Sequence, residues 1–538
     1  MSHTHVSWIC IAVFAAAGWA GHAGASELDL LPLGDPARAN DLSGAMPGEI
    51  VATSSGEVVS VETMAAGLAS ARVILLGEEH THLAQKYRIA EILEAIADVQ
   101  PNLVLGMEFF LNGDAEILAR WGRGELAGET FLREVGWYDR GTYRWGYYEP
   151  FMRVAFERSI PVVGLNVPRE IPRAVNRRGL DGLTDEQRTI VGEVVVDDSP
   201  QHRYLVSRYF GDTIVQMPSS WFDNMYAAQC LWDTVMARSI LRALPKDGAV
   251  VVVVGSGHVA YDLGIGRRIS DERRRLGLSE IEVATYCPVQ APIPDPEGEG
   301  LGGHPMGGGG EQPGGAPAVF SRSLADYVGV FENTGGVDAW PTMGMKLKAG
   351  DGGEPVVSIA WPDSRASEAG FETGDVILDL NGEDVEDLTS FRMMLSRLEW
   401  GDRVDARVRR GNEFLEIVSL LAPDPVVEER EIPPGWDVEP LADFSPDAES
   451  KVPASAPKVD VTTERVRRDG NPGWVVVRRE DIAVELHELD DNDYVRRSLY
   501  LEPQQDGAVD IRYERAPDGT ITHTQRLDRA GEPVPVNE

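Results

Sequence analysis

Four apolar runs in the first half of the chain end abruptly at polar or charged residues. They span residues 73–77, 103–107, 161–165 and 249–254, and the residues after them include Glu78, His80, Glu108, Asn166 and His258. Short apolar runs bounded in this way are typical of strands buried on both faces of a parallel sheet. Ligand sites of open α/β sheets lie outside the carboxyl ends of the strands. The pattern therefore predicts one site at which these polar residues converge.

Segments with helical spacing of apolar residues separate these predicted strands. The clearest helices are expected near residues 83–97, 114–121, 149–158 and 225–244, and a last strand is expected at 281–286. Strands that alternate with helices favour a mostly parallel sheet flanked by helices on both faces. The first domain is therefore predicted to be α/β and to span residues 60–290, after a leader at 26–59.

The second half of the chain alternates linkers with smaller domains. Residues 291–319 are rich in Gly and Pro, and residues 424–460 are rich in Pro and acidic groups. Such compositions cannot bury enough apolar surface to fold. Residues 320–423 predict a β-rich domain. Residues 461–538 alternate apolar and polar positions, which predicts a small antiparallel β domain whose role the pattern does not indicate.

The charge balance excludes one class of partner. The chain has 538 residues, with 87 acidic and 50 basic side chains and a formal net charge of −37. A field of this sign repels nucleic acid and anionic lipid surfaces, so we expect no nucleic-acid partner. Only three cysteines are present, and none forms a CxxC pair typical of a zinc site.

The N-terminus predicts export. Residues 8–17 form an apolar core, and Ala23 to Ala25 supply small residues suited to cleavage, although the preceding segment has no Lys or Arg. We expect a signal peptide at 1–25 and a periplasmic or secreted protein, with envelope association or an uncleaved anchor as alternatives. No later apolar stretch approaches membrane length, so no membrane span is expected in the mature chain.

The converging polar residues suit several kinds of chemistry. Carboxylate and imidazole groups, as in Glu78, His80, Glu108 and His258, are ligands for divalent ions such as zinc, manganese or iron. A metal ion there would activate water for hydrolysis. Without a metal, the same four groups are suited to general acid–base catalysis. A purely structural role also remains open, in which they satisfy one another at the edge of the sheet.

Five motifs in this half of the chain resemble those of a known family. They are LLGEEH at 75–80, GME at 106–108, GLNVP at 164–168, AQCLWDTVMA at 228–237 and GSGH at 255–258. Their order is similar to that of the ChaN-like haem-binding family, which is related to the Tiki proteases, the TraB proteins and the erythromycin esterases. The resemblance covers about residues 60–290. It implies an α/β fold, haem binding and a role in iron uptake at the cell envelope.

The resemblance also implies roles for particular residues. It places Glu78, His80, Glu108 and His258 at the centre of the site, as catalytic groups or metal ligands. The expected pocket-lining residues are Asn166, Gln229, Asp233, Arg140 and Arg144. The two arginines belong to an aromatic segment, residues 137–148, which is suited to stacking on a porphyrin while the arginines pair with its propionates. The family's haem ligand is expected to be a tyrosine, which the motifs do not place in this chain.

A second resemblance covers about residues 338–422. The segments GFETGDVILDLNG at 370–382, DLTSFR at 387–392 and RRG at 409–411 resemble a PDZ domain. Such domains bind an extended peptide by strand addition, and backbone amides hold its terminal carboxylate. The corresponding loop is expected to include Met343, Gly344 and Met345. The implied partner is therefore the C-terminus of a peptide or protein.

Together these observations favour an exported protein that binds haem or a related metal-bearing small molecule. Its PDZ module would recruit a peptide or protein partner. Two alternatives stay open on the sequence alone: a metal-dependent or Glu/His acid–base hydrolase of an ester or amide, and a non-catalytic envelope scaffold.

Overall fold

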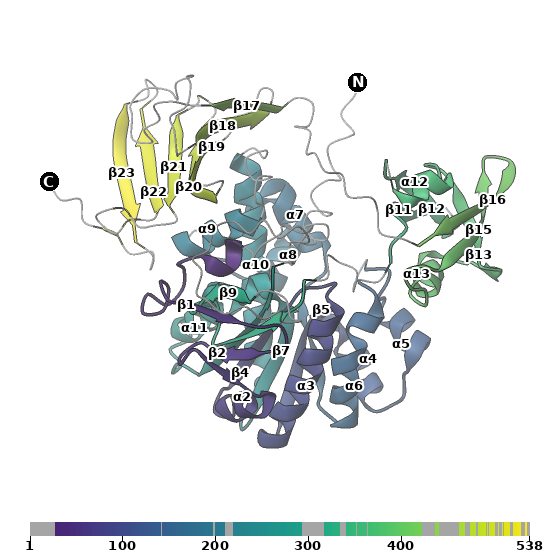
Figure 1. Cartoon of the computed structure of the whole chain (residues 1–538), viewed down its shortest axis with the longest axis horizontal. Coiled ribbons are helices and arrows are strands. Elements are labelled where there is room, and N and C mark those ends of the chain that lie inside the picture. The colour runs from purple at the N-terminus through teal and green to yellow at the C-terminus, as the bar shows by residue number, and fades with distance from the viewer. Residues whose placement is uncertain are drawn as a thin grey trace, which may run out of the picture.

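The computed structural model describes residues 27–421, apart from 141–142, 197–198, 210–218, 293–316, 334–340, 351 and 363, and then the strands and some adjoining residues between 436 and 534. The expected signal peptide and most of both expected linkers lie outside the described residues. The described chain forms an α/β domain, a PDZ-type domain and a C-terminal antiparallel sheet (Figure 1). The predicted fold class is confirmed.

An eight-stranded sheet forms the middle of the first domain, in the order β3-β2-β10-β8-β4-β7-β5-β6. Its strands are β2 (Ile50–Ala52), β3 (Glu57–Val59), β4 (Val73–Glu78), β5 (Leu103–Leu111), β6 (Val162–Asn166), β7 (Ala249–Gly255), β8 (Val283–Gln290) and β10 (Tyr327–Phe331). The six strands from β10 to β6 run parallel, whereas β2 pairs antiparallel with both of its neighbours. The four predicted strands are β4, β7, β5 and β6, and they are consecutive in the sheet.

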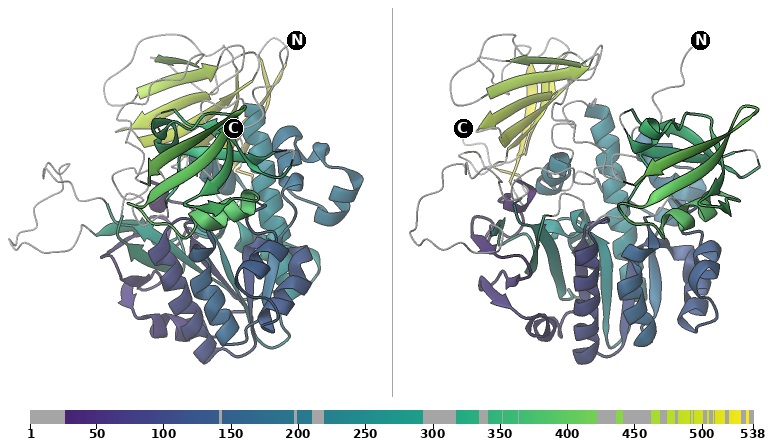
Figure 2. Two further views of the ribbon diagram at one scale, coloured as in Figure 1. Left: turned by 90° about the vertical axis from the view of Figure 1, so that its right-hand side faces the viewer. Right: turned by 45° about the vertical axis from the view of Figure 1, so that its right-hand side comes forward.

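Helices cover both faces of this sheet (Figure 2). They are α2 (Val61–Gly67), α3 (Leu83–Val99), α4 (Ala115–Gly122), α5 (Gly128–Glu134), α6 (Glu149–Glu157), α7 (Glu170–Arg178), α8 (Asp185–Val191), α9 (Pro200–Tyr209), α10 (Ser219–Ala243) and α11 (Ile265–Arg275). Successive strand residues face opposite sides. Ile74 and Leu76 therefore pack in a core with α2, α3 and α6, while Val73 and Leu75 pack in a core with α10 and α11.

Two segments outside the predicted boundaries complete the first domain. The expected leader supplies β2 and β3, and part of the stretch expected to belong to the PDZ domain supplies β10. β10 pairs with β8. Without β10, β8 would be an edge strand with unpaired backbone groups. A further short pair, β1 (Leu42–Ala45) with β9 (Ala318–Ser321), also joins the leader to this stretch. The first domain thus extends at both ends beyond residues 60–290.

The second domain contains a six-stranded sheet, in which five strands lie side by side and a short sixth strand pairs with one of them. It contains β11 (Met345–Ala349), β12 (Pro355–Ala360), α12 (Arg365–Ala369), β13 (Val376–Leu380), β14 (Glu383–Asp384), α13 (Leu388–Leu395), β15 (Arg403–Arg410) and β16 (Glu413–Leu420). The order is β11-β12-β13-β15-β16, with β14 paired to β13, so β11 lies at an edge of the described sheet. Phe391 from α13 packs in the core of this domain with Val357 and Ile377.

The last domain is a seven-strand antiparallel meander in chain order. Its strands are β17 (Trp436–Pro440), β18 (Thr462–Arg468), β19 (Trp474–Arg479), β20 (Ile482–Leu489), β21 (Val495–Tyr500), β22 (Asp510–Arg515) and β23 (Ile521–Leu527). The small antiparallel sheet was predicted, but β17 lies in the expected acidic linker. A buried ion pair of 2.7 Å joins Arg203 on α9 to Glu488 on β20, so this sheet is anchored to the first domain.

Candidate functional site

The predicted site residues lie at the carboxyl ends of neighbouring strands. Glu78 ends β4 and pairs in parallel register with Gly255, which ends β7. His258 follows β7 in a short 3-10 turn, Ser256–His258, and Glu108 lies near the end of β5. A Cβ placed on Gly255 would lie 3.0 Å from His80 Cε1, so glycine at this position lets the imidazole lie close to the strand end. The structure therefore brings Glu78, His80, Glu108 and His258 into one centre.

Glu78 is held between a histidine and a lysine. Its Oε1 lies 2.6 Å from His80 Nδ1, and its Oε2 pairs with the ammonium group of Lys86. Lys86 is fully buried on α3 and also donates a 2.6 Å hydrogen bond to the carbonyl oxygen of Glu79. Burying a carboxylate is costly unless it is paired. Lys86 therefore allows Glu78 to be buried at this edge in its charged form.

Glu108 and His258 form the opposite side of the centre. Glu108 Oε2 accepts a 2.8 Å hydrogen bond from the Gly255 amide, and Oε1 lies 3.7 Å from His258 Nε2. The other ring nitrogen of His258, Nδ1, lies 2.5 Å from Asp233 Oδ1 and 2.9 Å from Gln229 Nε2. A carboxylate at Nδ1 holds the imidazole with Nε2 toward the centre. The structure thus supports the predicted placement of Asp233 and Gln229 beside the site.

The two histidines differ in their tendency to carry a proton. Burial lowers the pKa of His80 below 6.5, although Glu108 and Glu79 partly oppose this. Burial also acts on His258, but the Asp233 carboxylate and its hydrogen bond outweigh it and raise the pKa of His258 above 6.5. At neutral pH we therefore expect a neutral His80 whose Nε2 is the nitrogen left for a ligand, beside a His258 that holds a proton more strongly than His80 does.

Three of the four predicted metal ligands come close enough to share an ion. One ligand atom from each of Glu78, His80 and Glu108 lies within 4.8 Å of the others. His258 lies beside this group at 3.7 Å from Glu108. The oxygens of Glu78 are already engaged by His80 and Lys86, so an ion there would have to displace one of these partners.

Aromatic side chains form one wall of the centre. The His80 ring lies 5.1 Å from the ring of Phe109 and 4.9 Å from that of Tyr143, measured between centroids. Trp137 Nε1 donates a 2.8 Å hydrogen bond to the carbonyl oxygen of Tyr143, which fixes that backbone position. Burial and the neighbouring Glu108 raise the pKa of Tyr143 well above 10, so its phenol is neutral at physiological pH.

The structure places three expected pocket residues in other surroundings. Arg140 forms a two-point ion pair with Asp114, at 2.5 and 2.7 Å. Arg144 donates to carbonyl oxygens of the PDZ domain, and Asn166 Oδ1 accepts a hydrogen bond from the neighbouring Val167 amide. None of these contacts involves the Glu/His centre. For the arginines, pairing with haem propionates would require them to leave these partners.

Three residues near the centre were missed in the sequence. Lys86 lies on the apolar stripe of its helix, three and four positions before Ile89 and Ala90, and that position was a usable signal. His202 lies 3.4 Å from Asp233 and extends the chain from His258 into the protein. Tyr209 packs its ring against Gly257, where an added Cβ would lie 3.3 Å from it. No local pattern marked His202 or Tyr209.

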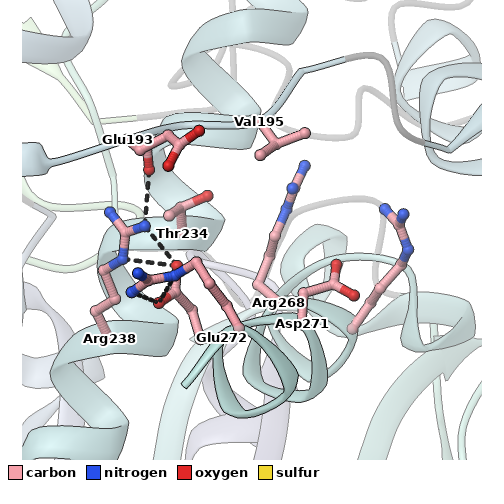
Figure 3. A pocket seen from close by; sticks show the side chains of 9 residues that line it. Glu193, Val195, Thr234, Arg238, Arg268, Asp271 and Glu272 are labelled. Carbon is pink, nitrogen blue, oxygen red and sulfur yellow. Dashed lines mark hydrogen bonds and ion pairs between the residues drawn. The ribbon is translucent and has the colours of Figure 1, made fainter. Parts of the chain in front are cut away.

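A separate cavity of about 340 Å³ lies between α10, α11 and residues 193–195 (Figure 3). Arg238 and Arg275 line it, but both pair with Glu272 there, and Arg238 also donates to the Val191 and Glu193 carbonyls. None of Glu78, His80, Glu108 or His258 lines this cavity. It is therefore distinct from the centre described above.

The expected peptide loop lies at the start of the edge strand β11. Gly344 has φ +66°, a conformation that favours glycine, and Met343 is buried in the core of the domain. The carbonyl oxygens of Met343 and Gly344 accept hydrogen bonds from Ala366 and Trp361. The loop is thus fixed beside a strand whose outer edge is unpaired within the described sheet.

The fold and the site define a two-part class: an α/β domain with a Glu/His centre at its strand ends, joined to a smaller β-rich domain. Residues 64–269 match the family model described as haem-binding uptake, Tiki superfamily, ChaN. Residues 341–418 match the PDZ domain model. The chain therefore carries a ChaN-type domain followed by a PDZ domain, as both resemblances predicted.

Parts of the chain are similar to solved structures. The structure of ChaN of Campylobacter jejuni with cofacial haem is 19% identical, covers 52% of this chain and 95% of that one, and gives a TM-score of 0.39. The HtrA3 PDZ domain bound to a phage-derived ligand is 19% identical over 15% of this chain and 83% of that one, with a TM-score of 0.14. No match was found among curated proteins. Within the described residues, no helix combines the length and apolar character needed to cross a membrane.

Proposed function

We propose that the ChaN-type domain binds haem at the crevice formed by the ends of β4, β7 and β5. The observation that carries this proposal is the convergence of His80, Glu108 and His258 beneath an aromatic wall, in a domain whose family model is that of haem-binding uptake. Haem supplies redox-active iron and a flat apolar ring edged by two propionates. The protein's part is to ligate the iron, stack on the ring and hold it away from water.

The residues at the crevice fit such a ligand chemically. His80 Nδ1 is occupied by Glu78, so Nε2 is the donor available to iron. Tyr143 beside His80 and Tyr209 beside Gly257 are the two phenols at this edge that we propose as candidate iron ligands. Phe109 and Tyr143 supply aromatic surface for stacking. The tyrosine expected from the family is therefore Tyr143 or Tyr209.

A hemin titration of the purified protein tests the proposal. We expect a saturable shift of the Soret band at about one equivalent, weakened at least tenfold in His80→Gln and in one of Tyr143→Phe or Tyr209→Phe, since loss of a ligand costs more than about 1.4 kcal/mol. Tyr87→Phe and His523→Gln are matched controls, because both side chains are exposed. A shift that does not saturate would refute haem binding at this site.

A second candidate function is hydrolysis assisted by a divalent metal. It is favoured by one observation, the 4.8 Å grouping of donor atoms from Glu78, His80 and Glu108. Elemental analysis of the purified protein separates it from the first: one equivalent of a transition metal, lost in His80→Gln and without a hemin shift, would favour the hydrolase. If the protein bound neither haem nor a transition metal, the result would favour the remaining alternative, a non-catalytic envelope scaffold.

Peptide binding by the PDZ domain and export of the protein are also part of the proposed function. We propose that the PDZ domain captures the C-terminus of a peptide along the free edge of β11, beside Met343 to Met345. We also propose export, supported by the apolar run at 8–17 and the small residues before position 26. Mass measurement of the mature protein from a culture would show the loss of residues 1–25.

A further inference from the structure

Helix α13 of the PDZ domain forms an ion pair and hydrogen bonds with the first domain along its length. At its N-terminal end, Asp387 pairs with Arg133 at 3.3 Å. Two residues further on, the hydroxyl of Thr389 donates a 2.6 Å hydrogen bond to Asp139. These contacts join the beginning of the helix to residues just before and just after Trp137.

The C-terminal end of α13 is held by Arg144. Its guanidinium donates to the carbonyl oxygens of Leu395 at 3.0 Å and Leu398 at 2.6 Å, and a cation there also complements the helix dipole. Between the two ends, Arg392 donates to the carbonyl oxygen of Tyr138, and Met393 is buried in the core of the first domain. Apolar burial, hydrogen bonds and charge thus combine at this contact.

The same stretch of the first domain also covers His80. Arg144 directly follows Tyr143, whose ring lies 4.9 Å from the His80 ring. The Tyr143 carbonyl oxygen accepts a hydrogen bond from Trp137, which lies two residues before Asp139. The described residues on either side of 141–142 are therefore fixed from one side by α13 and from the other by the Glu/His centre.

Helix α13 has a second face inside the PDZ domain. Phe391 packs in the PDZ core, and Leu395 packs against that core together with Met345 and Leu347 of β11. A peptide that binds a PDZ domain adds to the edge strand, which here is β11. A peptide bound along β11 would therefore lie beside a helix that is hydrogen-bonded to Tyr138, Asp139 and Arg144 of the first domain.

We propose that α13 couples the PDZ domain to the Glu/His centre by setting the position of Tyr143 over His80. The PDZ domain then acts as an intramolecular regulator of that centre, in addition to its peptide-binding role. An element that contacts both sites can carry energetic coupling between them, and the usual size of such coupling corresponds to about a 5- to 150-fold change in affinity. The haem arm of the test below rests on the proposed function, whereas the spectroscopic arm does not.

The test releases α13 in the full-length chain. Arg144→Met/Thr389→Val removes the Arg144 hydrogen bonds at the C-terminal end and the Thr389 hydrogen bond near the N-terminal end, and it keeps similar side-chain volumes. The matched control is Arg397→Met, since Arg397 is exposed and makes only a 3.5 Å pair with Glu383. In protein labelled at histidine with ¹⁵N, the His80 imidazole resonances, assigned with His80→Gln, report its surroundings without any ligand. We expect them to move in the release variant, toward their positions in Tyr143→Leu, and to stay in place in the control.

A second measurement separates coupling from misfolding. Asp139→Cys/Thr389→Cys places two thiols where these side chains now meet. Their oxidation to a disulfide links α13 to the first domain again. Introduced together with Arg144→Met, the cross-link should restore the His80 resonances, and its reduction should shift them again. Hemin affinity should change at least about fivefold in the release variant if haem binds here. Unchanged His80 resonances in a folded release variant would overturn the coupling, whereas absence of hemin binding alone would overturn only the proposed function.

Discussion

Lys86→Met should lower the free energy of unfolding of the first domain by about 3–5 kcal/mol, the usual cost of leaving one partner of a buried ion pair alone. Lys86 and its partner Glu78 are both almost completely buried, so water cannot compensate the remaining carboxylate. His80 Nδ1 would be the remaining polar contact of Glu78 among those described here. We therefore expect Glu78 to move or to take up a proton, and the centre to lose its shape.

Urea unfolding of the full chain, followed by near-ultraviolet circular dichroism, measures this loss. The double variant Glu78→Gln/Lys86→Met is the informative control, because replacing both charges removes the unpaired ion and should recover most of the stability. Lys246→Met checks the effect of the same side-chain change at an exposed position. A loss in Lys86→Met no larger than in Lys246→Met would show that Lys86 contributes little to the buried centre.

The shared site was predictable because its signal is local. A strand buried on both faces must be apolar throughout, so the change to Glu78, Glu108 or His258 marks where it meets the crevice. Neighbouring strand order was not in the pattern, yet parallel α/β topology brings the carboxyl ends to one edge whatever the order. Residues from three separate segments could therefore be predicted to lie together at this edge.

Pairings that depend on long-range packing were not predictable in the same way. β10 belongs to the first sheet because β8 needs a neighbour, but its five residues resemble any short strand. Arg140 and Arg144 suited propionate binding by residue type. Their actual partners, Asp114 and the end of α13, lie elsewhere in the chain. An arginine's partner is set by the fold around it, whereas a strand's burial is visible in its own residues.

The polar groups behind His258 also interact through long-range contacts that the sequence did not predict. These contacts have a consequence for the site. Asp233 lies between two histidines, 2.5 Å from His258 Nδ1 and 3.4 Å from His202 Nε2. His202 in turn lies 3.4 Å from the hydroxyl of Tyr226. Asp233, His202 and Tyr226 are all buried, so the orientation of His258 toward Glu108 depends on groups inside the protein. Asp233 is thus a positioning residue for the centre.

Asp233→Asn should lower the pKa of His258 and destabilise the protein chiefly in acid. The raised pKa of folded His258 means that its stabilising contribution is fully present below the unfolded value of about 6.5 and is lost as the pH rises through the folded value. Removing the carboxylate removes that contribution. We expect a loss of about 2–3 kcal/mol at about pH 5.5, in the range for a hydrogen bond to a charged group, and a much smaller loss near pH 9.

Urea unfolding at both pH values, with an NMR titration of the histidines, measures both parts of this prediction. Asp98→Asn is the control, because that carboxylate is largely exposed and pairs only with Arg158 among its described contacts. If the loss in Asp233→Asn were the same at both pH values, the carboxylate would act by packing alone and not by holding a proton on His258. A pH-dependent loss with an unchanged His258 pKa would instead assign the charged partner of Asp233 to His202, since this is the other imidazole within reach of that carboxylate.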